Sequence, residues 1–126
     1  MMPPAMRLFA LRGATTADRN DAKDILGATE ELMHELMGRN GLDTGAVVSC
    51  VFTVTPDLNA AFPATAARGL GFDRVPLLCA QEIAVPRALP RTIRVLMHYY
   101  AGEDHVARHV YLREARGLRE DLDAAQ

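Results

Sequence analysis

One arginine lies in the middle of a run that otherwise has the composition of a buried β-strand. The run is RTIRVLM, residues 91–97, and Arg94 is flanked by Ile93 and Val95. Removing a guanidinium from water is costly unless an anion pairs with it. Two partners are open from the sequence: Glu82, in a structural salt bridge, or a bound ligand. Because arginine grips planar carboxylates with paired hydrogen bonds, the second alternative predicts an anion-binding site.

Other polar residues interrupt or flank the expected strands and helices. They are Arg12, Arg68, Glu82 and Tyr111. Each also has a structural interpretation, since arginines extend over apolar neighbours into water and tyrosines pack with the hydroxyl at the surface. Alternation places Cys79 and Glu82 on opposite strand faces, so they share a site only if the strand bends or ends near residues 80–81. No neighbouring histidine or lysine activates Cys79, which is expected to be a small buried hydrophobe.

Several familiar chemistries lack support in the sequence. His105 and His109 would form a metal-binding pair on a helix, but the segment around them reads as extended and no cluster of further ligands accompanies them, so no metal site is predicted. Neither a glycine-rich phosphate loop nor a Ser-His-Asp pattern is recognisable. The net charge of −2 provides no general attraction to nucleic acid or to an anionic membrane.

Composition predicts a single globular domain spanning residues 1–126. Hydrophobic residues make up 49% of the chain and charged residues 24%. Cys50 and Cys79 both lie in apolar runs, which favours a reducing compartment over a disulfide framework. No run approaches the roughly 20 apolar residues of a membrane span, and the apolar run near the N-terminus is too short for a signal peptide. We therefore expect a cytoplasmic protein.

The elements that must position these residues alternate between strands and helices. A strand at residues 8–11 should end in a turn at 12–13, and a helix should begin at an N-cap, Asp18, and stop near 38–41. Pro63 and Gly71 bound a short helix. The remaining strands are expected at residues 47–55, 75–82, 92–100 and 106–114. This order predicts a mixed five-stranded sheet with one long and one short helix, in the α/β or α+β class.

Both faces of the strand at residues 92–100 are apolar. Ile93, Val95 and Met97 share one face, while Leu96 lies on the other. Two helices can cover only one face of such a sheet, so another surface must cover the second. The sequence therefore predicts a homo-oligomer in which sheets pack together.

Several segments, in order and at matching separations, resemble the AroH class of chorismate mutase. They are LRGATT, TPDLNAAFPATAAR, VPLLCAQE, IRV and RHVYL, within a similarity that runs from residue 8 to residue 122. The resemblance implies a homotrimer of pseudo-α/β-barrel appearance with active sites between subunits. It also implies conversion of chorismate to prephenate, in phenylalanine and tyrosine biosynthesis, without a cofactor.

The resemblance also implies roles for individual residues. Arg94 would face the ether oxygen of chorismate and one carboxylate, Arg12 would bind a carboxylate with support from Tyr111, Glu82 would accept the ring hydroxyl, and Cys79 would lie beside that hydroxyl. The adjacent subunit would contribute Phe62 and Ala64 as cleft wall and Arg68 as a second cation, and the C-terminal residues Leu118 and Arg119 would close over the cleft. The chain departs from the family at Thr65, where a lysine is frequent, and at Leu78, where a threonine is frequent.

Two other functions are alternatives to this one. A trimeric deaminase of reactive imines has a similar fold and also holds a substrate carboxylate, but has no evident need for Glu82 beside Cys79. A non-catalytic sensor that binds an anion from aromatic metabolism would fit the departures at Thr65 and Leu78. The chemistry of the family reaction needs no proton transfer and no covalent intermediate, so arginines and one glutamate are sufficient for it.

Overall fold

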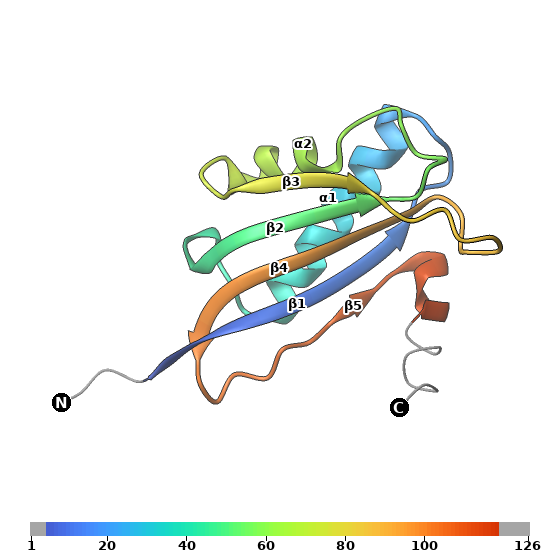
Figure 1. The fold of residues 1–126 in the computed structure, drawn as a ribbon. Coiled ribbons are helices and arrows are strands. Elements are labelled where there is room, and N and C mark those ends of the chain that lie inside the picture. The colour runs from blue at the N-terminus through green and yellow to red at the C-terminus, as the bar shows by residue number, and fades with distance from the viewer. Residues whose placement is uncertain (1–4, 119–126) are drawn as a thin grey trace.

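The computed structural model describes residues 5–118, in which five strands form one sheet with the helices behind it (Figure 1). The strands are β1 (Met6–Thr16), β2 (Val47–Val54), β3 (Leu77–Gln81), β4 (Thr92–Gly102) and β5 (Val110–Tyr111). Their order across the sheet is β3-β2-β4-β1-β5. β4 pairs antiparallel with β1 and β2, whereas β3 and β5 join as parallel edge strands. The predicted mixed five-stranded sheet is confirmed.

A long and a short helix pack on one face of the sheet. They are α1 (Ala22–Arg39) and α2 (Pro63–Ala67), and a wider helical turn, Arg68–Phe72, continues from α2. Gly71 has a φ of 100°, a left-handed conformation that glycine adopts without strain, which is why the helical run ends there. None of the helices in the described part of the chain combines the length and apolar character needed to cross a bilayer.

The predicted turn at residues 12–13 is wrong, because β1 continues through it to Thr16. Gly13 lies under α1, where the Cβ atom of any larger residue would come within 2.7 Å of Leu36 Cδ1 and 3.1 Å of Leu32 Cδ1. The glycine is therefore required by a close approach of helix and strand. From sequence alone, such a glycine cannot be distinguished from one that marks a turn. The strand positions Arg12 in mid-sheet instead of at a strand end.

The first helix begins later than its sequence pattern indicates. Asp21, not Asp18, is the N-cap, and its Oδ1 accepts the backbone N–H of Asp24 at 2.8 Å. Residues 17–21 carry the chain from the sheet to the helix layer, and Ala17 N–H still bonds to the carbonyl of Arg91. An aspartate near a helix start satisfies the capping pattern at either position, so only the path of the chain decides between them.

The last predicted strand is mostly irregular. Only Val110 and Tyr111 pair with β1. Before them, Asn40 at the end of α1 accepts the N–H of Arg108 at 2.8 Å and donates to its carbonyl at 3.0 Å. His109 Nδ1 accepts the N–H of Arg12 at 3.0 Å. Side chains therefore take the place of ladder bonds, which an extended sequence pattern cannot reveal.

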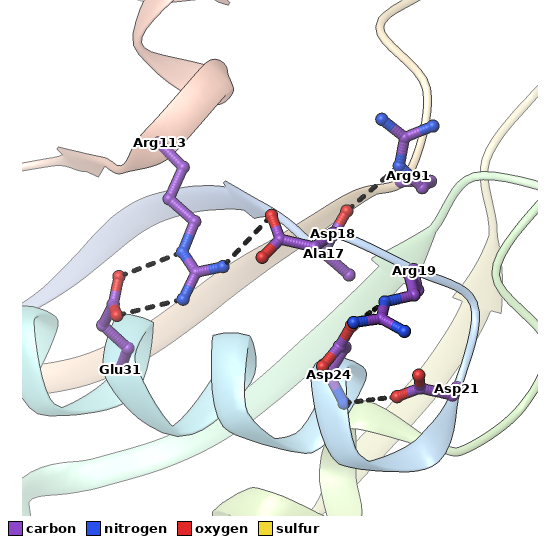
Figure 2. A network of polar contacts seen from close by, with 8 residues as sticks. All are labelled: Ala17, Asp18, Arg19, Asp21, Asp24, Glu31, Arg91 and Arg113. Atoms are coloured by element: carbon purple, nitrogen blue, oxygen red, sulfur yellow. Dashed lines mark hydrogen bonds and ion pairs between the residues drawn. The ribbon is translucent and has the colours of Figure 1, made fainter.

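A polar network ties the short helical turn after β5 to the middle of α1 and to the loop before it (Figure 2). The Arg113 guanidinium lies 3.3 Å from Glu31 Oε2 and 3.8 Å from Asp18 Oδ1. Nearby, Arg91 Nε donates to the carbonyl of Ala17 at 3.1 Å. The Arg113 contacts fasten the segment that follows Tyr111 against the helix layer, and the Arg91 contact ties the loop before β4 to the residue that follows β1.

Candidate active site

The face of the sheet that points away from α1 carries a cavity of about 480 Å³. Its lining residues come from β1, β2, β4 and β5 and from the helical segment after β5: Arg12, Gly13, Ala14, Val51, Thr53, Arg94, Val95, Leu96, Tyr111 and Leu118. The lining is largely apolar, with two guanidiniums and a phenol among it. Such a cavity suits a compact organic molecule that carries negative charge.

The structure shows which partner the Arg94 guanidinium has and where its side chain points. It alternates with buried Ile93 and Val95 and so points into the cavity, not into the core. Its side chain is 50% exposed, and its Nε lies 3.3 Å from Glu82 Oε1. The expectation of a guanidinium removed from water is therefore wrong within this chain. The salt bridge to Glu82 is present, and the guanidinium still lines the cavity.

Strand register places a second cation beside Arg94. In the pairing of β1 with β4, Arg12 lies opposite Leu96 and Arg94 opposite Ala14, so the two arginines are diagonal neighbours on one face. Within residues 5–118 Arg12 forms no ion pair. Tyr111 is paired with Ala14 across β1 and β5, which brings its side chain to the same cavity. Two cations and one phenol can bind a dianion.

Glu82 reaches this cavity by continuing the alternation of β3, since Ala80 is the parallel partner of Thr53 and Glu82 lies two residues further on the same face. Its N–H still bonds to the carbonyl of Val54 at 2.8 Å, and its carboxylate turns toward Thr53 and Arg94, both of which line the cavity. Thr53 Oγ1 donates to Glu82 Oε1 at 2.5 Å. Glu82 and Cys79 therefore keep to opposite faces of the sheet, as strict alternation predicts.

Cys79 lies in a different place from Arg94 and Glu82. It lines a second cavity of about 380 Å³ together with Phe62, which is 70% exposed, and residues 58–61. In one chain the structure therefore groups Cys79 with Phe62, a residue that the resemblance assigns to the adjacent subunit.

The other residues singled out from the sequence lie outside the first cavity, except Leu118, which lines it. Ala64 on α2 is buried, whereas Thr65 on α2 and Arg68 at its C-cap are exposed. Leu78 on β3 is 63% exposed. Arg119 falls outside the described residues.

Val51 and Thr53 are among the lining residues that the sequence analysis did not name as candidates. The signal for them was the alternation of β2, in which both point away from the buried Cys50 and Phe52. The sequence predicts a strand at residues 47–55 without indicating which of its faces carries a site. Only the pairing of Thr53 with Arg94 in β4 shows which of its faces carries the site.

The two histidines have structural partners. His105 Nε2 lies 2.8 Å from the hydroxyl of buried Tyr99, and His109 bonds to the backbone of Arg12. Within the described part of the chain, no three His, Cys, Asp or Glu residues are grouped so as to hold a metal ion.

Burial raises the pKa of Cys50 to about 12, so that thiol is neutral at ordinary pH.

Comparison with known proteins agrees with this geometry. A model of the chorismate mutase type I family matches residues 8–122. Chorismate mutase AroH of Thermus thermophilus is 48% identical over 119 residues, which cover 92% of this chain and 97% of that protein. Chorismate mutase AroH of Bacillus subtilis (strain 168) is 39% identical over 120 residues, 93% of this chain and 94% of that protein. The structure of chorismate mutase from Clostridium thermocellum superposes with a TM-score of 0.82 at 44% identity, covering 86% of this chain and 98% of that chain. The chain belongs to the chorismate mutase type I family.

Proposed function

We propose that this chain converts chorismate to prephenate, with the reaction taking place in the cavity lined by Arg12 and Arg94. Chorismate is a dianion that, apart from an ether oxygen and a ring hydroxyl, is hydrocarbon, and this cavity offers two cations on an apolar lining. The observation that carries the proposal is the diagonal placement of the two arginines on one sheet face, with Glu82 held at its rim. Membership of the chorismate mutase family supports chorismate as the dianion that binds here.

The rearrangement is a concerted [3,3] shift within one molecule, so the protein contributes orientation and electrostatics. Arg12, supported by Tyr111, binds a carboxylate and holds the side chain of the substrate over its ring in the compact reactive conformer. As the C–O bond breaks ahead of C–C bond formation, negative charge grows on the ether oxygen, and the Arg94 guanidinium stabilises that charge. Glu82 accepts a hydrogen bond from the ring hydroxyl.

The active assembly is proposed to be a cytoplasmic homotrimer with its sites between subunits. In a single chain Cys79 and Phe62 line a separate cavity from Arg94, and a neighbouring copy could bring the two groups together. Large apolar side chains are exposed, which supports further burial on assembly. They include Val48, Phe62, Leu78, Ile83, Leu96 and Tyr100. Arg68, Ala64 and Thr65 would accompany Phe62 across the interface, with Leu78 nearby on β3.

The test is to incubate the purified protein with chorismate and to follow the loss of its diene absorbance and the appearance of prephenate. Arg94→Ala should lower kcat/KM by about 100-fold or more, the cost of losing one preorganised donor at a developing oxyanion. Arg39→Ala, which removes a guanidinium paired with Glu35 on α1, is the control and should leave the rate unchanged. Tight binding of chorismate without turnover by the wild-type protein would refute the catalytic proposal and favour an anion sensor.

The assembly is tested separately by sedimentation. A trimer at micromolar concentration is the expected result, and a stable monomer that still turns over chorismate would contradict a site built between subunits.

A further inference from the structure

We propose that Thr53 is a positioning residue for this reaction: its hydroxyl fixes Glu82 and thereby keeps the Arg94 guanidinium available to the substrate. This inference rests on the proposed function and adds to it a residue that the family resemblance did not bring to attention. Thr53 lies on β2, in the lining of the cavity, and its side chain is only partly exposed.

The backbone brings the three side chains together. Thr53 is the direct partner of Arg94 in the antiparallel pairing of β2 with β4, and the partner of Ala80 in the parallel pairing of β2 with β3. The bond from Glu82 N–H to the carbonyl of Val54 extends the second pairing by one step beyond the end of β3. Thr53 is therefore the residue of the central strand that lies between the carboxylate and the guanidinium.

A hydrogen bond and an ion pair converge on one oxygen of Glu82. Thr53 Oγ1 donates to Oε1 at 2.5 Å, and Arg94 Nε lies 3.3 Å from the same atom. Among residues 5–118 no donor is bonded to Oε2. The occupied oxygen fixes the plane of the carboxylate, and the second oxygen can accept a hydrogen bond from the ring hydroxyl of the substrate.

A hydroxyl suits this role better than a charged donor would. Carboxylates and guanidiniums prefer a bidentate pair with two parallel hydrogen bonds, which would turn Arg94 toward Glu82 and away from the cavity. With Thr53 on Oε1, the contact seen is a single long one through Nε. The neutral hydroxyl restrains Glu82 without neutralising it, so both the carboxylate and most of the guanidinium stay available for the substrate.

The decisive variants are Thr53→Val, which keeps the shape of the side chain but removes the donor, and Thr53→Ser, which keeps the donor and removes a methyl group. We expect Thr53→Val to lower kcat/KM by about 10- to 100-fold, mainly through kcat, because a misplaced clamp costs more in the transition state than in the ground state. Thr53→Ser should stay within about threefold of the wild-type value. Equal losses in both variants, or no loss in Thr53→Val, would overturn the inference.

A double-mutant cycle separates positioning from a general structural role. If Thr53 acts through Glu82, Thr53→Val should change kcat/KM by less than about twofold in a Glu82→Gln background. The same 10- to 100-fold loss in that background would refute the inference while leaving the proposed function intact. Urea unfolding of the same four proteins supplies a readout that needs no turnover, and the two substitutions should be coupled there as well. Wild-type protein without turnover would refute the proposed function itself, and additive effects on unfolding would refute the contact.

Discussion

Replacing Gly13 with alanine tests the packing that brings Arg12 to the cavity. Gly13 lies in β1 directly beneath α1, and the space for a side chain is already occupied. An added methyl carbon would lie 2.7 Å from Leu36 Cδ1, 3.1 Å from Leu32 Cδ1 and 3.1 Å from Val95 Cγ1. Ordinary carbon contacts begin near 3.5 Å, so all three neighbours would have to give way.

The cost follows from how tightly those neighbours are held. Leu32 and Leu36 are 0% exposed and Val95 is 2% exposed, so none of them can turn into solvent. Relief requires off-rotamer side chains or a shift of α1 away from the sheet by a few tenths of an ångström. Overpacking of this kind destabilises proteins by about 1 to 3 kcal/mol. With three simultaneous close contacts, Gly13→Ala should lower the free energy of unfolding by about 2 kcal/mol.

The assay is urea unfolding at one fixed protomer concentration, since an oligomer gains apparent stability with concentration. Gly27→Ala is the matched control. Gly27 is exposed on α1, and an added Cβ meets nothing within 4 Å. The same substitution there should stabilise the protein by about 0.5 to 1 kcal/mol, because alanine restricts the unfolded chain and favours helix.

The two glycines should therefore respond with opposite signs. A Gly13→Ala protein as stable as the wild type would show that β1 and α1 can separate at no cost. In that case, the close approach could not be the reason for glycine at this position.

Three further predictions concern stability, each measured by urea unfolding. Asp21→Ala should lower the free energy of unfolding by about 1 kcal/mol, because it removes the N-cap of α1. Asp18→Ala removes only an exposed contact to Arg113 and should change stability by less than about 0.5 kcal/mol. The reverse order would mean that Asp18 caps the helix, as the sequence pattern indicates. Asn40→Ala should cost about 2 to 3 kcal/mol, since the side chain bonds to both backbone groups of Arg108 and is 8% exposed; a cost below 1 kcal/mol would mean that water replaces it. Burial raises the pKa of Cys50 from 9.0 to about 12, so on raising the pH the thiolate forms first in the unfolded chain. The contribution of this thiol to stability should be complete below pH 9 and should fall by about 1.4 kcal/mol per pH unit between pH 9 and pH 12. In Cys50→Ala this part of the pH dependence of the unfolding free energy should be absent.

Much of the site was visible in the sequence because alternation along a strand is a local property. The placement of Arg94 between Ile93 and Val95 already sets it on the opposite face from the core, and the same alternation puts Arg12 on the exposed face of β1. The motifs around Arg12, Glu82 and Tyr111 were sufficient to indicate the family. Where the sequence was misread, at the Gly13 turn and the Asp18 cap, the same residue type satisfies two local patterns.

The length of the last strand could not be predicted for a related reason. Residues 106–109 form no strand: both backbone groups of Arg108 bond to the side chain of Asn40, and the His109 ring accepts the N–H of Arg12. An extended conformation is encoded locally, whereas the partner of each backbone group is chosen by segments far away in the chain.

The sequence by itself determined the element types, the faces of the strands and the presence of arginines suited to a dianion. Tertiary structure alone decided that Thr53, Glu82 and Arg94 meet, and that Cys79 lies with Phe62 in another cavity. The reason is register. A strand's period of two fixes which side chains share a face, but which residues of three different strands become neighbours depends on hydrogen bonds between backbones that are distant in sequence.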